Sequence, residues 1–325
     1  MRASSLILIA LLALPALAAA PPKPGYRVHD FTPTFWRYWD EAKDKPQAEQ
    51  VRLFEERVVR AHPEVYNATV LTLEKDKPLG PQLAERWPRA MAFVGPHLDV
   101  ARMLSGRVGK DLPRYDARFR KAFPDFAYTG DVYFLVSMGA FDGATRQVNG
   151  RTALLFGTDV MAAVYGAEAN PESFFDHELF HIYHEQFPDP ALEDTLAQKL
   201  WHEGLAVYVA DTLNPGTPEA ILFGLPRDMP ARSRANLPAL AAQLRAKLDS
   251  KEQGDYERWF MKKSEDPVVP PRAGYFLGYL VAKELGRTRS LRELARLRGP
   301  ALRKELDRVL RQLEQTPAAA APAAK

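Results

Sequence analysis

The chain has 325 residues, no cysteine and a formal net charge of +3, which excludes a disulfide-stabilised fold and any metal site built from thiolates. Hydrophobic residues make up 46% and charged residues 26% of the chain, as is usual for a globular protein. The small net charge argues against binding to nucleic acid or to a membrane surface.

The first 20 residues have the layout of a secretory signal peptide. Met1 and Arg2 form a short positive start, an apolar run follows over 6–17, and small residues lie over 16–20. The run is too short to span a bilayer comfortably and no second apolar stretch is long enough, so we predict no transmembrane segment. We therefore expect an exported protein, periplasmic or secreted, whose fold is stabilised by its core or by a metal.

The region 21–128 is predicted to be helical after a Pro-rich leader. Thr32-Pro33 predicts a helix start, with Thr32 as the N-cap. The aromatic residues that follow are more typical of a core than of a ligand site: Phe35, Trp36, Tyr38 and Trp39. Helical patterns continue to about residue 126, with breaks near Pro63, Pro78 and Pro96.

A small sheet and two helices are predicted over 129–215. Residues 131–137 and 151–156 have strand character, and Asn149-Gly150 is a hairpin signal, so we expect an antiparallel sheet over 131–158. Asn170-Pro171-Glu172 predicts the start of a helix that ends before Pro188. After a turn over 188–194, a second helix is expected to end at Asn214-Pro215-Gly216.

The region 216–315 is expected to be helical, and the Pro/Ala-rich segment 316–325 to be disordered. Residues 287–314 contain nine basic and four acidic residues, with leucines at helical spacing. We interpret this segment as two solvated helices broken at Gly299-Pro300, and an anion-binding surface is the alternative. The predicted fold class is α+β, mostly helical, with a small sheet beside the helix that carries the chemistry.

The chemistry-bearing pattern is His177-Glu178-Leu179-Phe180-His181 on the first helix after the sheet. Residues i and i+4 lie on one helix face, so the two imidazoles can bind one Zn²⁺ ion. Glu178 is rotated by about 100° from His177, so its carboxylate can reach a water at the metal without binding the metal itself. It would then act as a general base.

A catalytic zinc site needs a third protein ligand and one open position. His184 lies too far along the helix from His177 to share one metal with it. The antiparallel register of the two helices about the turn near 191 places Glu203 opposite His181, with His202 as the alternative third ligand. We expect Gly204 and Ala206 to let these two helices approach each other closely.

These residues resemble the gluzincins, which are zinc metallopeptidases with H-E-x-x-H on one helix and a glutamate ligand on the next. They are most similar to a family of bacterial putative zinc-dependent proteases that pair an N-terminal Phe-Trp helix with H-E-x-x-H and E-G-x-A, here 203–206. The resemblance implies a zincin-like catalytic core over 129–215, one zinc ion and hydrolysis of a peptide or protein substrate. It also implies that Tyr275, in a Y-x-x-G pattern, stabilises the oxyanion; Tyr279 is a weaker candidate.

Two departures from the gluzincin pattern limit what can be carried over. The G-x-M-E-N element of aminopeptidases is absent, and Val207 stands where thermolysin-like enzymes have an Asp that supports a histidine ligand. Asp159, Asp176 and Asp211 are the candidates for that supporting role. We expect the strand 151–156 to pair with the substrate backbone. A non-catalytic metal-binding or scaffold protein of the cell envelope is the alternative function.

Overall fold

The structure is a computed structural model that describes residues 25–167, 171–261, 266 and 268–316. The expected signal peptide and most of the expected disordered tail lie outside these residues. The described chain is mostly helical with one small sheet, which confirms the predicted α+β class. None of its helices combines the length and the apolar character needed to cross a membrane.

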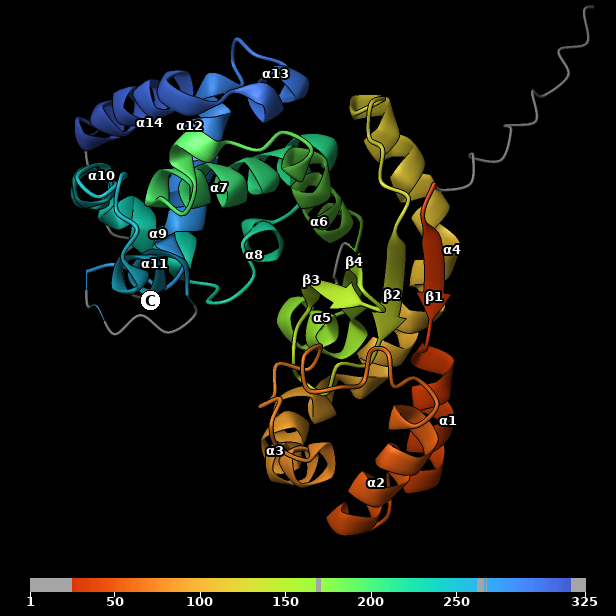
Figure 1. The fold of residues 1–325 in the computed structure, drawn as a ribbon. Coiled ribbons are helices and arrows are strands. Elements are labelled where there is room, and N and C mark those ends of the chain that lie inside the picture. The colour runs from red at the N-terminus through yellow and green to blue at the C-terminus, as the bar shows by residue number, and fades with distance from the viewer. Residues whose placement is uncertain (1–24, 168–170, 262–265, 267, 317–325) are drawn as a thin grey trace, which may run out of the picture.

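The described chain begins with a short strand, Arg27–Asp30, and ends in helices, and Figure 1 shows helices on either side of the sheet. The helices between this first strand and the other strands of the sheet are α1 (Thr32–Ala42), α2 (Gln47–Phe54), α3 (Leu79–Val94) and α4 (Leu98–Ala122). The helices after it are α5 (Thr158–Tyr165), α6 (Pro171–Glu185), α7 (Leu196–Leu213), α8 (Glu219–Leu222), α9 (Met229–Ala235), α10 (Leu237–Arg245), α11 (Gln253–Phe260), α12 (Ala273–Leu285), α13 (Leu291–Arg296) and α14 (Gly299–Glu314).

The sheet has four strands in the order β1-β2-β4-β3: β1 (Arg27–Asp30), β2 (Asp131–Leu135), β3 (Gly143–Val148) and β4 (Arg151–Gly157). Only β3 and β4 are antiparallel, joined at Asn149-Gly150, where both residues have a positive φ as a tight hairpin requires. The β1–β2 and β2–β4 pairs are parallel. The predicted antiparallel sheet is therefore wrong in part, because a strand from the Pro-rich leader pairs across a long helical connection.

The order of the strands also corrects the expected substrate strand. β4 lies between β2 and β3, so both of its edges are already paired. Among the described strands, β3 is the edge strand on this side of the sheet, so its outer edge is where a peptide could pair with the backbone.

The N-terminal helices form part of the core, as the aromatic pattern predicts. Phe35 and Tyr38 are fully buried, and each packs edge-on against Phe54 of α2. The start of α1 differs from the prediction, because Thr32 lies inside the helix and the Asp30 carboxylate accepts hydrogen bonds from its backbone N–H (3.0 Å) and hydroxyl (2.6 Å). The expected breaks are confirmed: Pro63 lies in a loop, Pro78 directly precedes α3, and Pro96 lies in the turn before α4.

The basic C-terminal segment forms two helices, α13 and α14, with the break directly before Gly299 as predicted. Leu302, Leu306 and Leu310 are buried, and α14 packs against α10. Several arginines of this segment pair with carboxylates, as Arg289 does with Glu305 (2.7 Å) and Arg303 with Asp249 (2.7 Å). The pairing supports the interpretation as surface helices rather than as an anion-binding face.

Three helices that carry the candidate site pack in sequence from the sheet outward: α6, α7 and α12 (Figure 1). The closest approach joins α7 to α12, where a Cβ added at Gly204 would lie 2.1 Å from the backbone carbon of Gly278. The sequence-based expectation that Gly204 faces α6 is therefore wrong. Because Gly204 follows Glu203 and Gly278 is one turn beyond Tyr275, this contact determines how those two side chains are placed relative to each other.

Candidate metal centre

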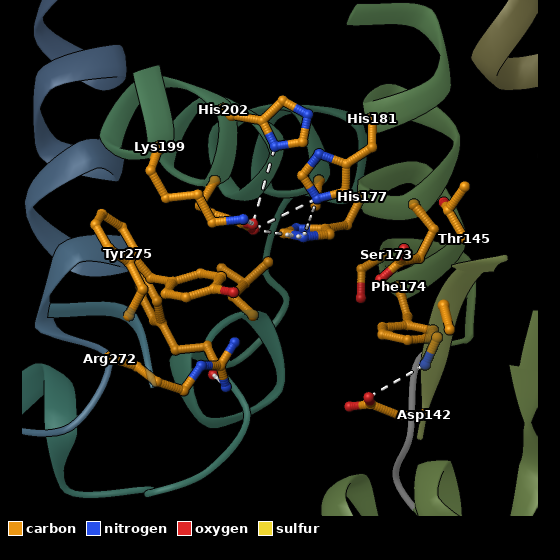
Figure 2. A pocket seen from close by; sticks show the side chains of 18 of the residues that line it. Asp142, Thr145, Ser173, Phe174, His177, His181, Lys199, His202, Arg272 and Tyr275 are labelled. Atoms are coloured by element: carbon orange, nitrogen blue, oxygen red, sulfur yellow. Dashed lines mark hydrogen bonds and ion pairs between the residues drawn. The ribbon is translucent and has the colours of Figure 1, made fainter. Parts of the chain in front are cut away.

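The sheet fixes the position of α6 through aromatic packing. Phe175 lies with its ring centroid 4.1 Å from that of Phe156 and 5.6 Å from that of Phe134, on the buried face of the sheet. His177, Glu178 and His181 lie on α6 and line a pocket of about 880 Å³, a volume typical of small-molecule and peptide subsites. Figure 2 shows this pocket, with the α7 and α12 side chains on the opposite side.

The three predicted ligands converge in this pocket. The two Nε2 atoms of His177 and His181 are 3.0 Å apart, and Glu203 Oε2 lies 3.8 Å and 3.4 Å from them, respectively. Ligand atoms around a tetrahedral zinc with bonds of 2.0–2.1 Å lie about 3.3 Å apart. The spacing and the donor types, two imidazoles and one carboxylate, therefore fit a small divalent cation, and they form the one such group found among the described residues.

The protonation states favour metal binding. Burial, together with the neighbouring His202, lowers the pKa of His181 to about 3, so its imidazole is neutral at physiological pH and has a lone pair to donate. Burial alone would raise the pKa of Glu203, but His181 and hydrogen bonds from the surrounding histidines lower it below the ordinary value. The pocket therefore contains an ionised carboxylate beside a neutral imidazole, which is the donor state that a metal requires.

Lys199 orients the carboxylate ligand and was missed by the reasoning from sequence. Its Nζ lies 2.7 Å from Oε1 of Glu203, whereas the other oxygen, Oε2, is the one nearest His177 and His181. Burial acts to lower the pKa of Lys199, but the Glu203 carboxylate raises it above the ordinary value, so the lysine remains charged. The signal in the sequence is the i, i+4 spacing of Lys199 and Glu203 on one helix.

His202 and His184 lie beside the ligand group rather than in it. The ring of His202 stacks on that of His181 with centroids 4.2 Å apart, and its Nδ1 is 3.9 Å from Glu203 Oε1. The geometry thus brings Glu203, not His202, to the two histidines. His184 is buried, with its ring stacked on Phe180, and its Nε2 is 3.3 Å from Arg298 Nη1.

None of the three aspartates considered as supports for a histidine ligand has that role in the part of the chain that the structure describes. Asp159 accepts from the backbone of Ser137 and Gly139, and Asp211 accepts from Tyr279. Asp176 accepts from Arg118 and Asn214. The Nδ1 atom of His181 is buried without a hydrogen-bond partner among the described residues, so stacking on His202, rather than a hydrogen bond at Nδ1, restrains the orientation of this ring.

Glu178 lies between the ligand group and the edge strand. A Cβ added at Gly143, the first residue of β3, would lie 2.8 Å from the carboxyl carbon of Glu178, so only glycine leaves room for this carboxyl group. Burial, with smaller contributions from Asp142 and Glu203, raises the pKa of Glu178 to about 8. A carboxyl group with such a pKa can both accept and donate a proton near neutral pH.

Tyr275 extends from α12 into the same pocket, between Lys199 and Arg272 (Figure 2). Burial raises its pKa above the ordinary value, and the nearby Glu203 carboxylate adds to this effect, so the hydroxyl keeps its proton and can donate it in a hydrogen bond. Tyr279 instead donates to Asp211 (2.8 Å). Of the two tyrosines considered as oxyanion donors, Tyr275 is therefore the one placed at the pocket.

Among the other charged residues of the pocket that were not singled out from the sequence are Arg272 and Asp142. Arg272 directly precedes α12 and Asp142 directly precedes β3, but nothing in the sequence around them indicates that they line the pocket. Comparison of the chain with models of protein families, with curated proteins and with solved structures found no match in any of the three.

Proposed function

We propose that this protein is a zinc-dependent metallopeptidase of the gluzincin type, with His177, His181 and Glu203 as the ligands of one zinc ion. The observation that carries the proposal is the convergence of these three donors, from two helices, beside the carboxyl group of Glu178. A purely structural metal site does not require such a carboxyl group.

Zinc bound by these residues would supply a Lewis acid that activates a water molecule and polarises the scissile carbonyl. Glu178 accepts the proton of the attacking water and passes it to the leaving amine nitrogen. The Tyr275 hydroxyl donates a hydrogen bond to the oxyanion that develops on the former carbonyl oxygen. Lys199 holds one oxygen of Glu203, which leaves the other oxygen for the metal.

The edge strand β3 supports a peptide as the substrate. Its first residues line the pocket together with Glu178, and no other described strand pairs with its outer edge. An extended peptide that adds to this edge would lie with its backbone amides along the pocket wall. We place this activity outside the cytoplasm, in the periplasm or secreted, on the layout of residues 1–20.

The decisive experiment compares the unsubstituted protein with Glu178→Gln. Zinc content is measured by elemental analysis, and cleavage of a peptide library is followed by mass spectrometry with and without 1,10-phenanthroline. We expect Glu178→Gln to retain zinc and to lose activity by about 10²- to 10⁴-fold, the usual contribution of a general base. Glu49→Gln, in α2 outside the pocket, is the matched control and should behave as the unsubstituted protein does.

The same experiment separates the peptidase from a metal-binding scaffold. A protein that binds zinc but cleaves no peptide in the library would support the scaffold alternative. Equal cleavage by the Glu178→Gln variant and the unsubstituted protein would show that the proposed mechanism is wrong.

A further inference from the structure

Arg272 is a charged residue of the pocket that the proposed mechanism does not use. It immediately precedes α12, and its guanidinium is enclosed by the protein while part of the side chain is open to the pocket. Nη1 donates to the backbone carbonyls of Phe223 (2.9 Å) and Leu225 (3.1 Å), and the guanidinium carbon lies 4.1 Å from the centre of the Tyr275 ring. Because two carbonyls and an aromatic ring contact the guanidinium, the orientation of this planar group is fixed.

The remaining donors of this guanidinium are available to a ligand. Among the described residues, no carboxylate lies within ion-pair distance of Arg272, although Asp142 and Glu178 interact with it electrostatically at longer range. Apart from the two carbonyls bound by Nη1, its side-chain partner is Tyr275. Many arginines elsewhere in the chain have such pairs, as Arg245 and Arg303 do, whereas Arg86 and Arg298 bond to backbone carbonyls instead. An enclosed cation without an anionic partner is costly, and a carboxylate is the group that its planar fork matches best.

The backbone conformation at Arg272 indicates that an arginine side chain is needed at this position. Its φ is 64° and its ψ is 19°, a left-handed conformation that costs a residue with a side chain on the order of 1 kcal/mol. Glycine or asparagine would adopt this conformation more readily. The fold therefore keeps an arginine where another residue would be less strained, which is common at ligand-binding positions.

Two charges of the pocket, Arg272 and Asp142, lie apart from each other, unlike Lys199 and Glu203, which pair at 2.7 Å. Figure 2 shows Arg272 and Asp142 on opposite walls, and the Asp142 carboxylate accepts from the Tyr165 hydroxyl (3.3 Å) instead of pairing with the arginine. Tyr275 separates Arg272 from the ligand group, since it stacks on Arg272 and is close enough to Glu203 for the two to interact electrostatically. A group bound at Arg272 would thus lie one side chain away from the metal site.

We propose that Arg272 binds a carboxylate of the peptide substrate, located within about one or two residues of the scissile bond, since an extended residue spans roughly 3.3–3.6 Å. This inference rests on the proposed function for the identity of the ligand as a peptide. The carboxylate is either the C-terminal group of the peptide or the side chain of Asp or Glu. The first source makes the enzyme a carboxypeptidase, and the second makes it selective for acidic sequences.

The test uses the full-length Glu178→Gln protein, loaded with zinc, so that peptides bind without being consumed. It is immobilised and offered four pools of random hexapeptides, ending in carboxylate or in carboxamide, and either containing or lacking Asp and Glu. Mass spectrometry of the retained peptides gives the ratio between each charged pool and its neutral counterpart. A charge-assisted bidentate contact predicts a ratio of about tenfold or more. The pool that shows the enrichment identifies the source.

Two substitutions in the Glu178→Gln background assign the effect to Arg272. Arg272→Asn tolerates the left-handed backbone and should reduce the ratio to about one. Arg272→Lys keeps the charge but loses the fork, so its ratio should be intermediate. Zinc content and melting temperature are measured in parallel and report any loss of the contacts to Phe223 and Leu225. If Arg272 had only a structural role, its substitution would change these two quantities but not the ratio between the charged and neutral pools.

The outcomes distinguish this proposal from the proposed function. No enrichment with Arg272 present, or an equal enrichment in the Arg272→Asn variant, would overturn the carboxylate site even if the unsubstituted protein cleaves peptides. Enrichment that depends on Arg272, in a protein that cleaves none of the pools, would support the carboxylate site and contradict the peptidase. Failure of all pools to bind would also overturn the carboxylate site.

Discussion

The candidate metal pocket and the C-terminal helices α13 and α14 are both rich in charge, but they use it in opposite ways. On the helices, arginines and carboxylates pair at the surface, as Arg303 and Asp249 do at 2.7 Å, with Asp249 70% exposed. In the pocket, Lys199 pairs with the buried carboxylate of Glu203, whereas Arg272 and Asp142 form no pair with each other. The density of charge in a sequence therefore says little about function; enclosed charges without mutual partners say more.

The largest difference between the two regions should appear on metal removal. His181→Ala removes a ligand, so we expect loss of zinc and of nearly all peptidase activity. We also expect a melting temperature several degrees lower, because a metal ion present at a free concentration of 1,000 times its Kd stabilises the fold by about 4 kcal/mol. Elemental analysis measures the zinc content, a peptide-cleavage assay the activity, and calorimetry the melting temperature. His97→Ala, before α4, is the control. An unchanged melting temperature after complete metal removal would show that the metal does not tie α6 to α7.

A second prediction concerns the contact between α7 and α12 that supports the pocket. Gly204→Ala places a methyl group against the backbone of Gly278, so the helices must separate, and we expect a loss of about 1–3 kcal/mol or more in the free energy of unfolding. Denaturant titration measures the change. Gly106→Ala in α4, where an added Cβ meets nothing within 4 Å, should stabilise by up to about 1 kcal/mol. Equal effects of the two substitutions would contradict the close packing at Gly204.

A third prediction compares one cation from each region. Lys199→Met removes the group that holds Oε1 of Glu203, and we expect zinc affinity to fall about 10- to 100-fold, as is usual for residues that orient a ligand. Competition with a chromogenic chelator measures the affinity. Arg303→Met on α14 should leave it unchanged, because that arginine contacts only surface groups such as Asp249. Similar zinc affinities for the two variants would show that Lys199 does not support the metal site.

The smallest effect is expected from pH at the surface of α14. A hydrogen bond from Arg303 lowers the pKa of Asp249 below its ordinary value. This pair therefore contributes stability above the ordinary aspartate pKa of about 4, and the contribution is lost as the pH falls toward the lower folded pKa. Because the pair is exposed, we expect no more than about 0.2–1 kcal/mol, less at high salt. A double-mutant cycle with Asp249→Asn and Arg303→Met between pH 2 and 7 measures it; a coupling that persists at pH 2 would refute the assignment.

Much of the local structure could be predicted from the sequence. The breaks at Pro78 and Gly299, the hairpin at Asn149-Gly150 and the end of α7 at Asn214 all follow from backbone preferences of a few neighbouring residues. The spacing of His177 and His181 also follows from the helix alone, since four residues complete about one turn. Such features do not depend on what the rest of the chain does.

The contacts between distant elements could not be predicted in the same way. The register argument brought Glu203 to His181 because the turn between their helices is short, but it could not show that Gly204 faces Gly278 across 74 residues of chain. The same holds for β3 as the edge strand and for the parallel pairing of β1 with β2. Each depends on the order in which separate elements pack.

The sequence by itself determined that a metal site in this chain has to be built from histidine and carboxylate, because cysteine is absent, and it determined the helix face from which two histidines project. The register of the two helices also indicated Glu203 as the carboxylate that joins the two histidines. Tertiary structure alone decided which lysine holds that carboxylate, and that Arg272 faces the pocket with no carboxylate within ion-pair distance among the described residues. The physical reason is range: helix geometry acts over one turn, whereas the burial and pairing of a charge depend on every element that packs around it.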